Sequence, residues 1–415
     1  MKNTGTYVTA LLIPAVFAGQ VLALGQSSAR SVAMGGAHIG LASGIDAAKY
    51  NPANLGLSNH RYTGIELVGL GANISNNSFS LSDYNKYTGA FLTSEDKADI
   101  LAKIPAEGLK LAVDVEADAL CISSGSFALN ATGVGIADIN LNRDLFDLVL
   151  NGNTFADTID VTGSYSTVLS YVSAGLSYGK GIYSSGSREL SVGVTAKYLR
   201  GIGIEQVTEL EGGFATYATG LAGNGRMIAQ TAEGGTGYAV DLGAALKLNN
   251  NYTLGLCVEN FISRVKWNRK PQEHAYIFSF DTMTVDNMGD DFVTSDDYTI
   301  DIDPFTTTLP SAMTFGVANT SGSLVWAVDW KQGFRKHDGA STKPRISAGV
   351  EYSGLKVIPL RVGYAAGGSR NTAFSFGSGL HLWAYYLDFA AVTGSTFSGY
   401  SAKGLNVAVS TGLHF

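Results

Sequence analysis

The chain ends with the sequence Leu405-Asn406-Val407-Ala408-Val409-Ser410-Thr411-Gly412-Leu413-His414-Phe415. Most residues at odd positions are apolar, and the residues between them are small or polar. Alternation with a period of two is typical of a β-strand that has one apolar face. In a membrane barrel, the apolar face contacts lipid and the opposite face lines the interior. This segment therefore predicts the last strand of a transmembrane β-barrel.

The same alternation recurs upstream, in the segments 190–198, 238–248, 252–258, 324–330, 346–352, 360–364 and 383–391. Tyr or Trp often closes the apolar face of these segments, as the aromatic girdles of a membrane barrel require. The composition agrees, with 51 Gly, 20 Tyr and 19 Phe but only 8 Pro. We expect an all-β chain that crosses the outer membrane of a Gram-negative bacterium as an antiparallel barrel.

Connection lengths give an independent test of this interpretation. If Phe415 ends in the periplasm, the periplasmic connections should be short and the external ones long. Short connections are predicted near 380–382, 353–354, 320–322, 249–251 and 180–188. Long connections are predicted at 393–403, 367–371, 333–342, 264–310 and 201–235. Short and long alternate throughout, which supports the barrel.

The first third of the chain is less regular. Segments 65–71 and 119–130 are predicted strands. A short helix should begin at Thr93-Ser94-Glu95-Asp96 and end at Ile104 before Pro105. A second is expected over 144–150, ending at Gly152. Segment 109–115 fits a strand or a helix. As a strand it gives about fourteen strands in all, and the alternative is twelve.

The N-terminus resembles an export signal, with Lys2, an apolar run and a small-residue ending. We predict a signal peptide over 1–23 with cleavage after Ala23; cleavage after Ala18 is the alternative. The net charge of −7 provides no attraction for nucleic acid. Cys121 and Cys257 are too few for a disulfide framework, and we interpret both as buried or lumenal.

Two stretches near the N-terminus carry a family resemblance. They are Ala-Arg-Ser-Val-Ala-Met-Gly-Gly-Ala at 29–37 and Asp-Ala-Ala-Lys-Tyr-Asn-Pro-Ala-Asn-Leu at 46–55. They resemble the N-terminus of the FadL superfamily of outer-membrane barrels, which includes PorV, and the general pattern is similar to an uncharacterised Bacteroidetes-type or related branch. The resemblance implies a barrel over 61–415 that encloses a hatch over 24–60, with Asn51, Pro52 and Ala53 at the hatch positions. From the residues alone, a periplasmic strand or linker is the alternative for 24–60.

The resemblance also implies a function. FadL-like barrels take up hydrophobic small molecules passively, and this is the leading hypothesis. The alternative is a non-transporting barrel that, like PorV, anchors or shuttles surface or secreted proteins.

If the apolar residues face lipid, a set of charged residues must face the lumen: Lys197, Asp241, Lys247, Glu259, Asp329, Arg345, Glu351, Arg361 and Asp388. Charges there need partners or water. We expect ion-pair ladders that brace a plugged barrel; a polar pathway or ligand site is the other interpretation.

Three further features complete the predictions. An acidic external loop holds Asp286, Asp290, Asp291, Asp296, Asp297, Asp301 and Asp303, which we interpret as solvated and bridged to lipopolysaccharide rather than as a metal site. His381 and His414 lack a catalytic flanking motif, so we expect no enzyme and no cofactor. The terminal Phe415 resembles the signal read by the barrel-assembly machinery.

Overall fold

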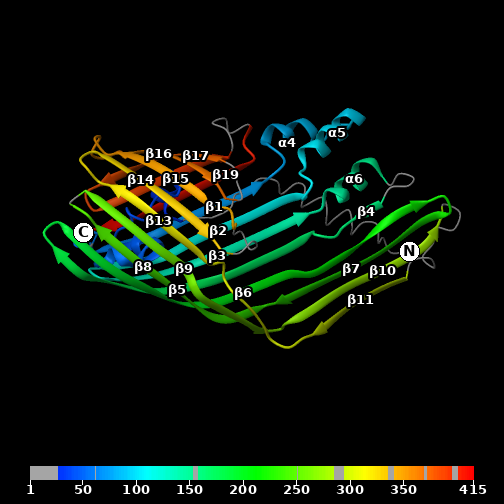
Figure 1. Cartoon of the computed structure of the whole chain (residues 1–415), viewed down its shortest axis with the longest axis horizontal. Coiled ribbons are helices and arrows are strands. Elements are labelled where there is room, and N and C mark those ends of the chain that lie inside the picture. Colours follow the sequence, from blue (N-terminus) through cyan, green and yellow to red (C-terminus); the bar gives the residue numbers. More distant parts are fainter. Residues whose placement is uncertain are drawn as a thin grey trace.

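The chain forms a closed antiparallel barrel of fourteen strands in a computed structural model (Figure 1). The structure describes residues 27–60, 62–152, 158–249, 251–284, 294–334, 341–368, 372–394 and 401–415, so the predicted signal peptide lies outside it. In order around the wall, the barrel strands are β1 (Gly64–Asn76), β2 (Leu109–Ser124), β3 (Phe127–Leu141), β5 (Tyr165–Ser185), β6 (Arg188–Tyr217), β8 (Gly234–Lys247), β9 (Tyr252–Arg269), β13 (Ala312–Asn319), β14 (Leu324–Gly333), β15 (Arg345–Tyr352), β16 (Leu360–Gly367), β17 (Thr372–Leu382), β18 (Tyr385–Gly394) and β19 (Gly404–His414).

The barrel closes where the first strand meets the last. Leu70 of β1 lies opposite Val409 of β19, and the backbone N–H of Phe415 donates to the Thr63 carbonyl at 2.7 Å. The predicted strand number of fourteen is confirmed. The ambiguous segment 109–115 is part of β2.

Side chains of the wall alternate between the outside and the lumen. On β6, Val192, Val194 and Tyr198 are exposed on the outside, whereas Ser191 and Thr195 are fully buried inside. Large apolar side chains exposed in this regular way are stable only against lipid. The helices in the described part of the chain are all too short or too polar to span a membrane.

The two ends of the barrel differ. The end that carries Phe415 has mostly short turns, and we call it the plug end; the opposite end, with the long connections, is the loop end. β5 and β6 meet in a tight turn at the plug end, because β5 runs to Ser185 and β6 starts at Arg188. The predicted connection over 180–188 was therefore too long.

A sheet projects beyond the barrel at the loop end (Figure 1). β6 is 30 residues long; its first part pairs with β8 and its second part with β7. The projecting sheet has the order β4–β6–β7–β10–β11, where the added strands are β4 (Thr158–Asp160), β7 (Gly220–Ala232), β10 (Gln272–Met283) and β11 (Thr294–Asp301). β12 (Phe305–Thr307) pairs with β9.

This sheet corrects two predictions, because 201–235 and 264–310 were expected to be loops. Glu205, Glu209 and Glu211 show why the prediction was wrong. The projecting part of β6 carries carboxylates where a strand in contact with lipid would carry apolar residues. A strand with two hydrated faces lacks the amphipathic alternation by which the other strands were recognised.

Three helices lie at the loop end: α4 (Leu81–Tyr87), α5 (Ser94–Lys103) and α6 (Arg143–Asn151) (Figure 1). α5 begins at the predicted capping box, in which Thr93 accepts from the Asp96 N–H and the Asp96 carboxylate accepts from the Thr93 N–H. α6 ends at Gly152 as predicted. α4 was not predicted; it has a similar box, formed by Ser80 and Asp83.

Candidate functional site: the plug and the lumenal cavity

Residues 27–60 lie inside the barrel, and we call this segment the plug. It contains α2 (Ala29–Ala33), α3 (Ile45–Tyr50) and the 3-10 helix η1 (Pro52–Gly56). Almost all of its side chains are buried, including Met34, Leu55 and Leu57, which are fully buried. At the plug end, Ser58 donates to Glu189, which also pairs with Lys247 at 3.0 Å.

The Asn-Pro-Ala triplet connects the plug to the wall. Asn51 is extended, as a residue before proline prefers, and its Oδ1 caps η1 by accepting from the Ala53 N–H at 3.1 Å. The same side chain donates through Nδ2 to the Ala244 carbonyl of β8 at 3.0 Å. Ser191 of β6 donates to the Ala53 carbonyl at 2.6 Å. The predicted hatch residues thus form the joint between η1 and the strands β6 and β8.

Glycines of the wall face the plug on many sides. A Cβ added to any of them would lie closer than 3.0 Å to a plug atom, which real Cβ atoms essentially never do. These wall glycines are Gly179, Gly193, Gly243, Gly255, Gly349, Gly363 and Gly377. At Gly349 and Gly363 the neighbour is the plug backbone at Met34 and Gly35, and Gly35 itself has a φ of +72°. The plug therefore fits the wall at backbone contact.

A chain of ion pairs links the plug to β15–β18. Arg30 of the plug contacts Glu351 at 2.9 Å, and Glu351 also accepts from Arg361 at 2.6 Å. Arg361 reaches Asp388 at 2.7 Å, and His381 contacts the same carboxylate at 3.0 Å. Three of the residues predicted to carry lumenal charge, Glu351, Arg361 and Asp388, are buried in this chain.

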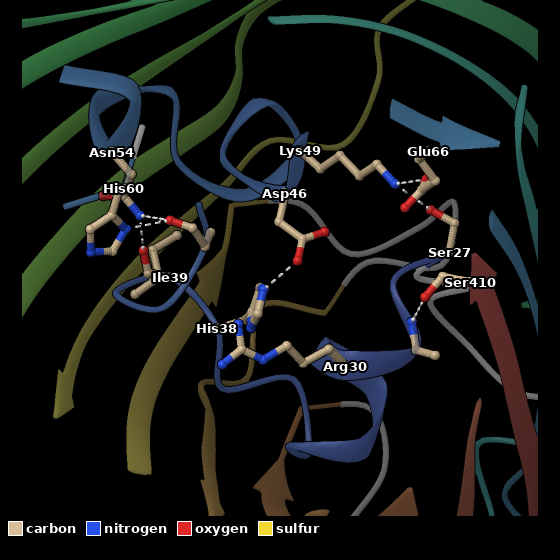
Figure 2. A network of polar contacts seen from close by, with 12 residues as sticks. Ser27, Arg30, His38, Ile39, Asp46, Lys49, Asn54, His60, Glu66 and Ser410 are labelled. Atoms are coloured by element: carbon tan, nitrogen blue, oxygen red, sulfur yellow. Dashed lines mark hydrogen bonds and ion pairs between the residues drawn. The ribbon is translucent and has the colours of Figure 1, made fainter. Parts of the chain in front are cut away.

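A second ionic contact joins the plug to β1 and β2 (Figure 2). Lys49 of α3 contacts Glu66 of β1 at 2.6 Å and Asp118 of β2 at 2.5 Å. Burial would lower the pKa of Lys49, but the two carboxylates outweigh burial and hold its pKa well above the usual range. Cys121 lies beside these carboxylates in a metal-like grouping. Because the Lys49 ammonium already supplies the positive charge, we infer no metal there.

The plug also has polar contacts of its own (Figure 2). His38 contacts Asp46 at 2.9 Å. Burial would raise the pKa of Asp46, but the hydrogen bond to His38 and the charges of Lys49 and Arg30 outweigh it and hold the pKa at about 2. The backbone N–H groups of His38 and Ile39 both donate to Asp329 of β14, at 2.6 and 2.8 Å. Asp329 therefore anchors the turn after α2.

The remaining residues of the predicted lumenal set also lie on the inner wall. Lys197 pairs with Asp241 at 2.6 Å, and Glu259 pairs with Lys331 at 2.9 Å. Arg345 donates to the Gly367 carbonyl and has no carboxylate partner among the residues that the structure describes.

A cavity of about 350 Å³ occupies the lumen on the loop side of the plug. Its floor is formed by Ile39, Lys49 and Tyr50 of the plug. One wall carries three carboxylates at alternate positions of β2, which we call the acidic row: Asp114, Glu116 and Asp118. The opposite strands contribute Lys331 and Arg345, and an apolar side is formed by Tyr171, Leu199 and Leu309. The cavity is thus mixed, with charged and apolar walls.

The apolar side of the cavity continues toward the loop end as a buried apolar cluster. This cluster contains Leu169, Leu199, Ile204, Ala232, Ala239, Val265, Trp267 and Leu309, with Tyr171 and Phe305 packed against it. Trp267 is fully buried and donates through Nε1 to Thr307 at 2.9 Å. Leu199 and Leu309 belong to both the cluster and the cavity, so the two are continuous.

The wall is interrupted next to the cavity. The pairing of β2 with β3 shifts register between Asp118 and Ile122, and Leu120 has a φ of +57° in this bulge. Asp118 and Asn130 lie at this interruption and also line the cavity.

Sequence reasoning missed the acidic row, although the signal was present. In Asp114-Val115-Glu116-Ala117-Asp118, acidic and apolar residues alternate as in the other strands. The partners in the plug, such as Arg30 and Lys49, carried no comparable signal, because a short helix in a lumen has no period that identifies its neighbours.

Other predicted residues lie away from the lumen or outside the description. Asp296, Asp297 and Asp301 lie on β11, whereas Asp286, Asp290 and Asp291 fall outside the described residues. Both cysteines are buried with free thiols. Phe415 is exposed at the plug end.

Solved structures resemble this barrel along nearly all of its length. The toluene transporter TodX of Pseudomonas putida matches with a TM-score of 0.54 at 15% identity, covering 95% of this chain and 100% of that chain. A FadL homologue of Pseudomonas aeruginosa matches with a TM-score of 0.50 at 11% identity, covering 95% and 99%. This chain has the FadL fold. At sequence identities this low, the similarity establishes the fold of this chain but not the ligand that it binds.

Two further comparisons complete this result. The toluene transporter TbuX of Ralstonia pickettii gives a TM-score of 0.51 at 14% identity, covering 93% of this chain and 98% of that chain. A family of unknown function (DUF5723) matches residues 52–232 of this chain. No curated protein matches its sequence.

Proposed function

We propose that this FadL-like barrel lies in the outer membrane of a Gram-negative bacterium and takes up small, mainly apolar molecules passively. The observation that carries the proposal is the cavity of about 350 Å³ that continues into the apolar cluster. A dry apolar cavity of about 150 Å³ binds benzene, so this volume suits a substituted single ring or a short branched chain. Apolar walls with a few polar groups are typical of ligand sites.

The route follows from the position of the plug. A ligand would enter from the loop end and reach the cavity beside Leu199 and above Tyr50. The backbone contacts at the wall glycines leave it no straight path onward. The interruption between β2 and β3 adjoins the cavity at Asp118 and Asn130. We infer that the ligand leaves sideways there.

The similar structures support the choice of a first ligand. TodX and TbuX are described as toluene transporters, and other forms of TodX as monoaromatic hydrocarbon channels. Because the sequence identity is low, their ligand specificity cannot be transferred to this chain. Toluene therefore serves as a probe and not as an assigned substrate.

Uptake of labelled toluene by cells with and without the gene tests the proposal. We expect faster uptake with the gene. Leu199→Trp should fill part of the cavity and reduce uptake severalfold, whereas Ile202→Trp, at an exposed position of the same strand, should not. Equal uptake in cells with and without the gene would contradict the proposal.

A second candidate is the docking of a surface or secreted protein. It is favoured by the projecting sheet, in which β11 pairs with β10 along one edge and most of its residues are exposed. Exposed strands recruit partners by edge pairing. Tyr298→Pro would block such pairing, so a surface protein that co-purifies with the wild type but not with this variant would support docking.

The proposal also covers the partners of the barrel and its lack of enzymatic activity. We infer contact with outer-membrane lipid and lipopolysaccharide, and assembly through Phe415 by the barrel-assembly machinery. We infer no enzymatic activity, which agrees with the transporter and channel descriptions of the similar structures. Deletion of Phe415 should lower the yield of folded, heat-modifiable barrel, and an unchanged yield would count against this role.

A further inference from the structure

One wall of the cavity carries negative charge that the described residues neutralise only in part. The acidic row points inward from β2, and Glu66 lies beside it on β1. Lys49 contacts Glu66 and Asp118. Glu116 accepts one hydrogen bond, from the Ser27 N–H at 3.2 Å, and no cation contacts it in the part of the chain that the structure describes. Three carboxylates on alternate residues repel each other, so a second cation would be favourable.

Buried polar atoms without partners line the same side of the cavity. Asn406 of β19 and Ser173 of β5 are each only 6% exposed, yet Asn406 Oδ1 and Ser173 Oγ have no hydrogen-bond partner. Asn130 Oδ1 of β3 is also unpartnered. All three residues line the cavity. The two amide oxygens only accept hydrogen bonds and the Ser173 hydroxyl can also accept, so a ligand with several donors would satisfy this wall.

The opposite side differs in its charges and not in its unpartnered atoms, because Thr314 Oγ1 of β13 and Asp329 Oδ1 of β14 also lack partners there. Lys197 and Lys331 are matched by the carboxylates of Asp241 and Glu259. Arg345 and Lys343 also line the cavity, on and just before β15. β15 lies eight strands after β2 around the fourteen-stranded wall, and therefore nearly opposite it. Arg345 and Lys343 therefore lie across the cavity from the acidic row.

We propose that the cavity selects small amines, and that a protonated ammonium group lies against Glu116 and the unpartnered oxygens. The apolar part of the same molecule packs on Tyr171, Leu199 and Leu309, which continue into the apolar cluster. An ammonium supplies both a positive charge and three donors for this wall. This inference rests on the proposed uptake function and names its ligand class.

Three probes of equal length separate charge from apolar contact: 3-phenylpropylamine, 3-phenylpropanol and 3-phenylpropionate. Binding to the full-length barrel in nanodiscs is followed by the fluorescence of its tryptophans, because Trp267 lies in the apolar cluster. We expect the amine to bind at least tenfold more tightly than the alcohol, and the propionate to bind most weakly. Equal binding of amine and alcohol, or tighter binding of the propionate, overturns the inference.

Glu116→Gln should remove the advantage of the amine over the alcohol. Glu205→Gln, an exposed carboxylate of β6 outside the cavity, is the matched control and should preserve the advantage. Thermal unfolding of each variant with and without probes checks that the barrel is folded. If Glu116→Gln binds the amine as the wild type does, the inference is overturned.

The proposed uptake function can be tested separately from the proposed preference for amines. Toluene carries no charge, so its gene-dependent uptake by the wild type tests the proposed function without the ammonium group. If toluene uptake does not depend on the gene, the proposed function is wrong. If the amine and the alcohol bind equally, only the proposed ligand class is wrong.

Discussion

The lumen has two halves, one filled by the plug and one that holds the cavity. Similar residues line both halves, but their packing and their partners differ. Around the plug, glycines admit backbone contact, and charges such as Arg30, Glu351 and Arg361 have partners. Around the cavity, Glu116 lacks a cation and Asn406 Oδ1 lacks a donor. A half in which these charges are paired is suited to hold still, and a half with a carboxylate that no cation contacts is suited to bind. The following substitutions test this difference, from the largest expected effect to the smallest.

Replacing Lys49 by Met should have the largest effect. It leaves the buried carboxylates of Glu66 and Asp118 without the cation that contacts both. Breaking a buried ion pair in this way costs about 3–5 kcal/mol. The free energy of unfolding in urea, measured in lipid vesicles, gives the loss. The combination with Glu66→Gln and Asp118→Asn should recover most of it, and failure to recover would show that Lys49 acts otherwise.

Gly363→Val should weaken the fit of the plug. The added side chain would meet the backbone of Met34 and Gly35, and such overpacking costs about 1–3 kcal/mol. Gly135→Val is the matched control, since a Cβ at Gly135 has nothing within 4 Å. The same unfolding measurement applies to both. Equal stabilities of the two variants would mean that the plug can shift to accommodate the added side chain, in contrast to the tight fit that the wall glycines indicate.

Asp46 gives the plug a defined pH dependence. Its pKa is about 2 in the folded chain and 3.8 as the ordinary value, so the difference corresponds to about 2 kcal/mol. Because the folded pKa is the lower one, this stability is present above about pH 3.8 and is lost as the pH falls through about 2. Comparison of the wild type with Asp46→Asn between pH 7 and pH 2 isolates the effect. A difference that stays constant over this range would contradict it.

The same substitution, serine to alanine, can be made in each half of the lumen. Ser191 donates to the Ala53 carbonyl of the plug, whereas Ser173 Oγ lines the cavity without a partner. Ser191→Ala should cost about 1 kcal/mol, because it removes a buried hydrogen bond. Ser173→Ala should leave the unfolding free energy unchanged or slightly increase it. Equal losses at both positions would remove the distinction between the halves.

The sequence was sufficient for the barrel wall because lipid imposes a simple rule on it. The alternation in 405–415 places Asn406 and Ser410 inward, where they are buried in the structure. Likewise Glu351, Arg361 and Asp388 were placed inside from their neighbours alone. The contacts of the plug follow no such rule, since Arg30 meets Glu351 across 321 residues. Only the folded chain brings them together.

The projecting sheet was missed for the opposite reason. Both faces of the outer part of β6 are away from lipid, so Glu209 and Glu211 carry no information about a membrane face. The Asn51-Pro52-Ala53 triplet was recognised by resemblance, but its contact with Ala244 depends on the position of β8 and could not be read from the sequence.

The wall glycines also bear on the order of assembly. They belong to seven strands from β5 to β17, and the atoms of the plug touch them at distances that leave no clearance. We infer from this fit that the plug takes its place before β1 and β19 pair, so that the hydrogen bonds that close the barrel form around it.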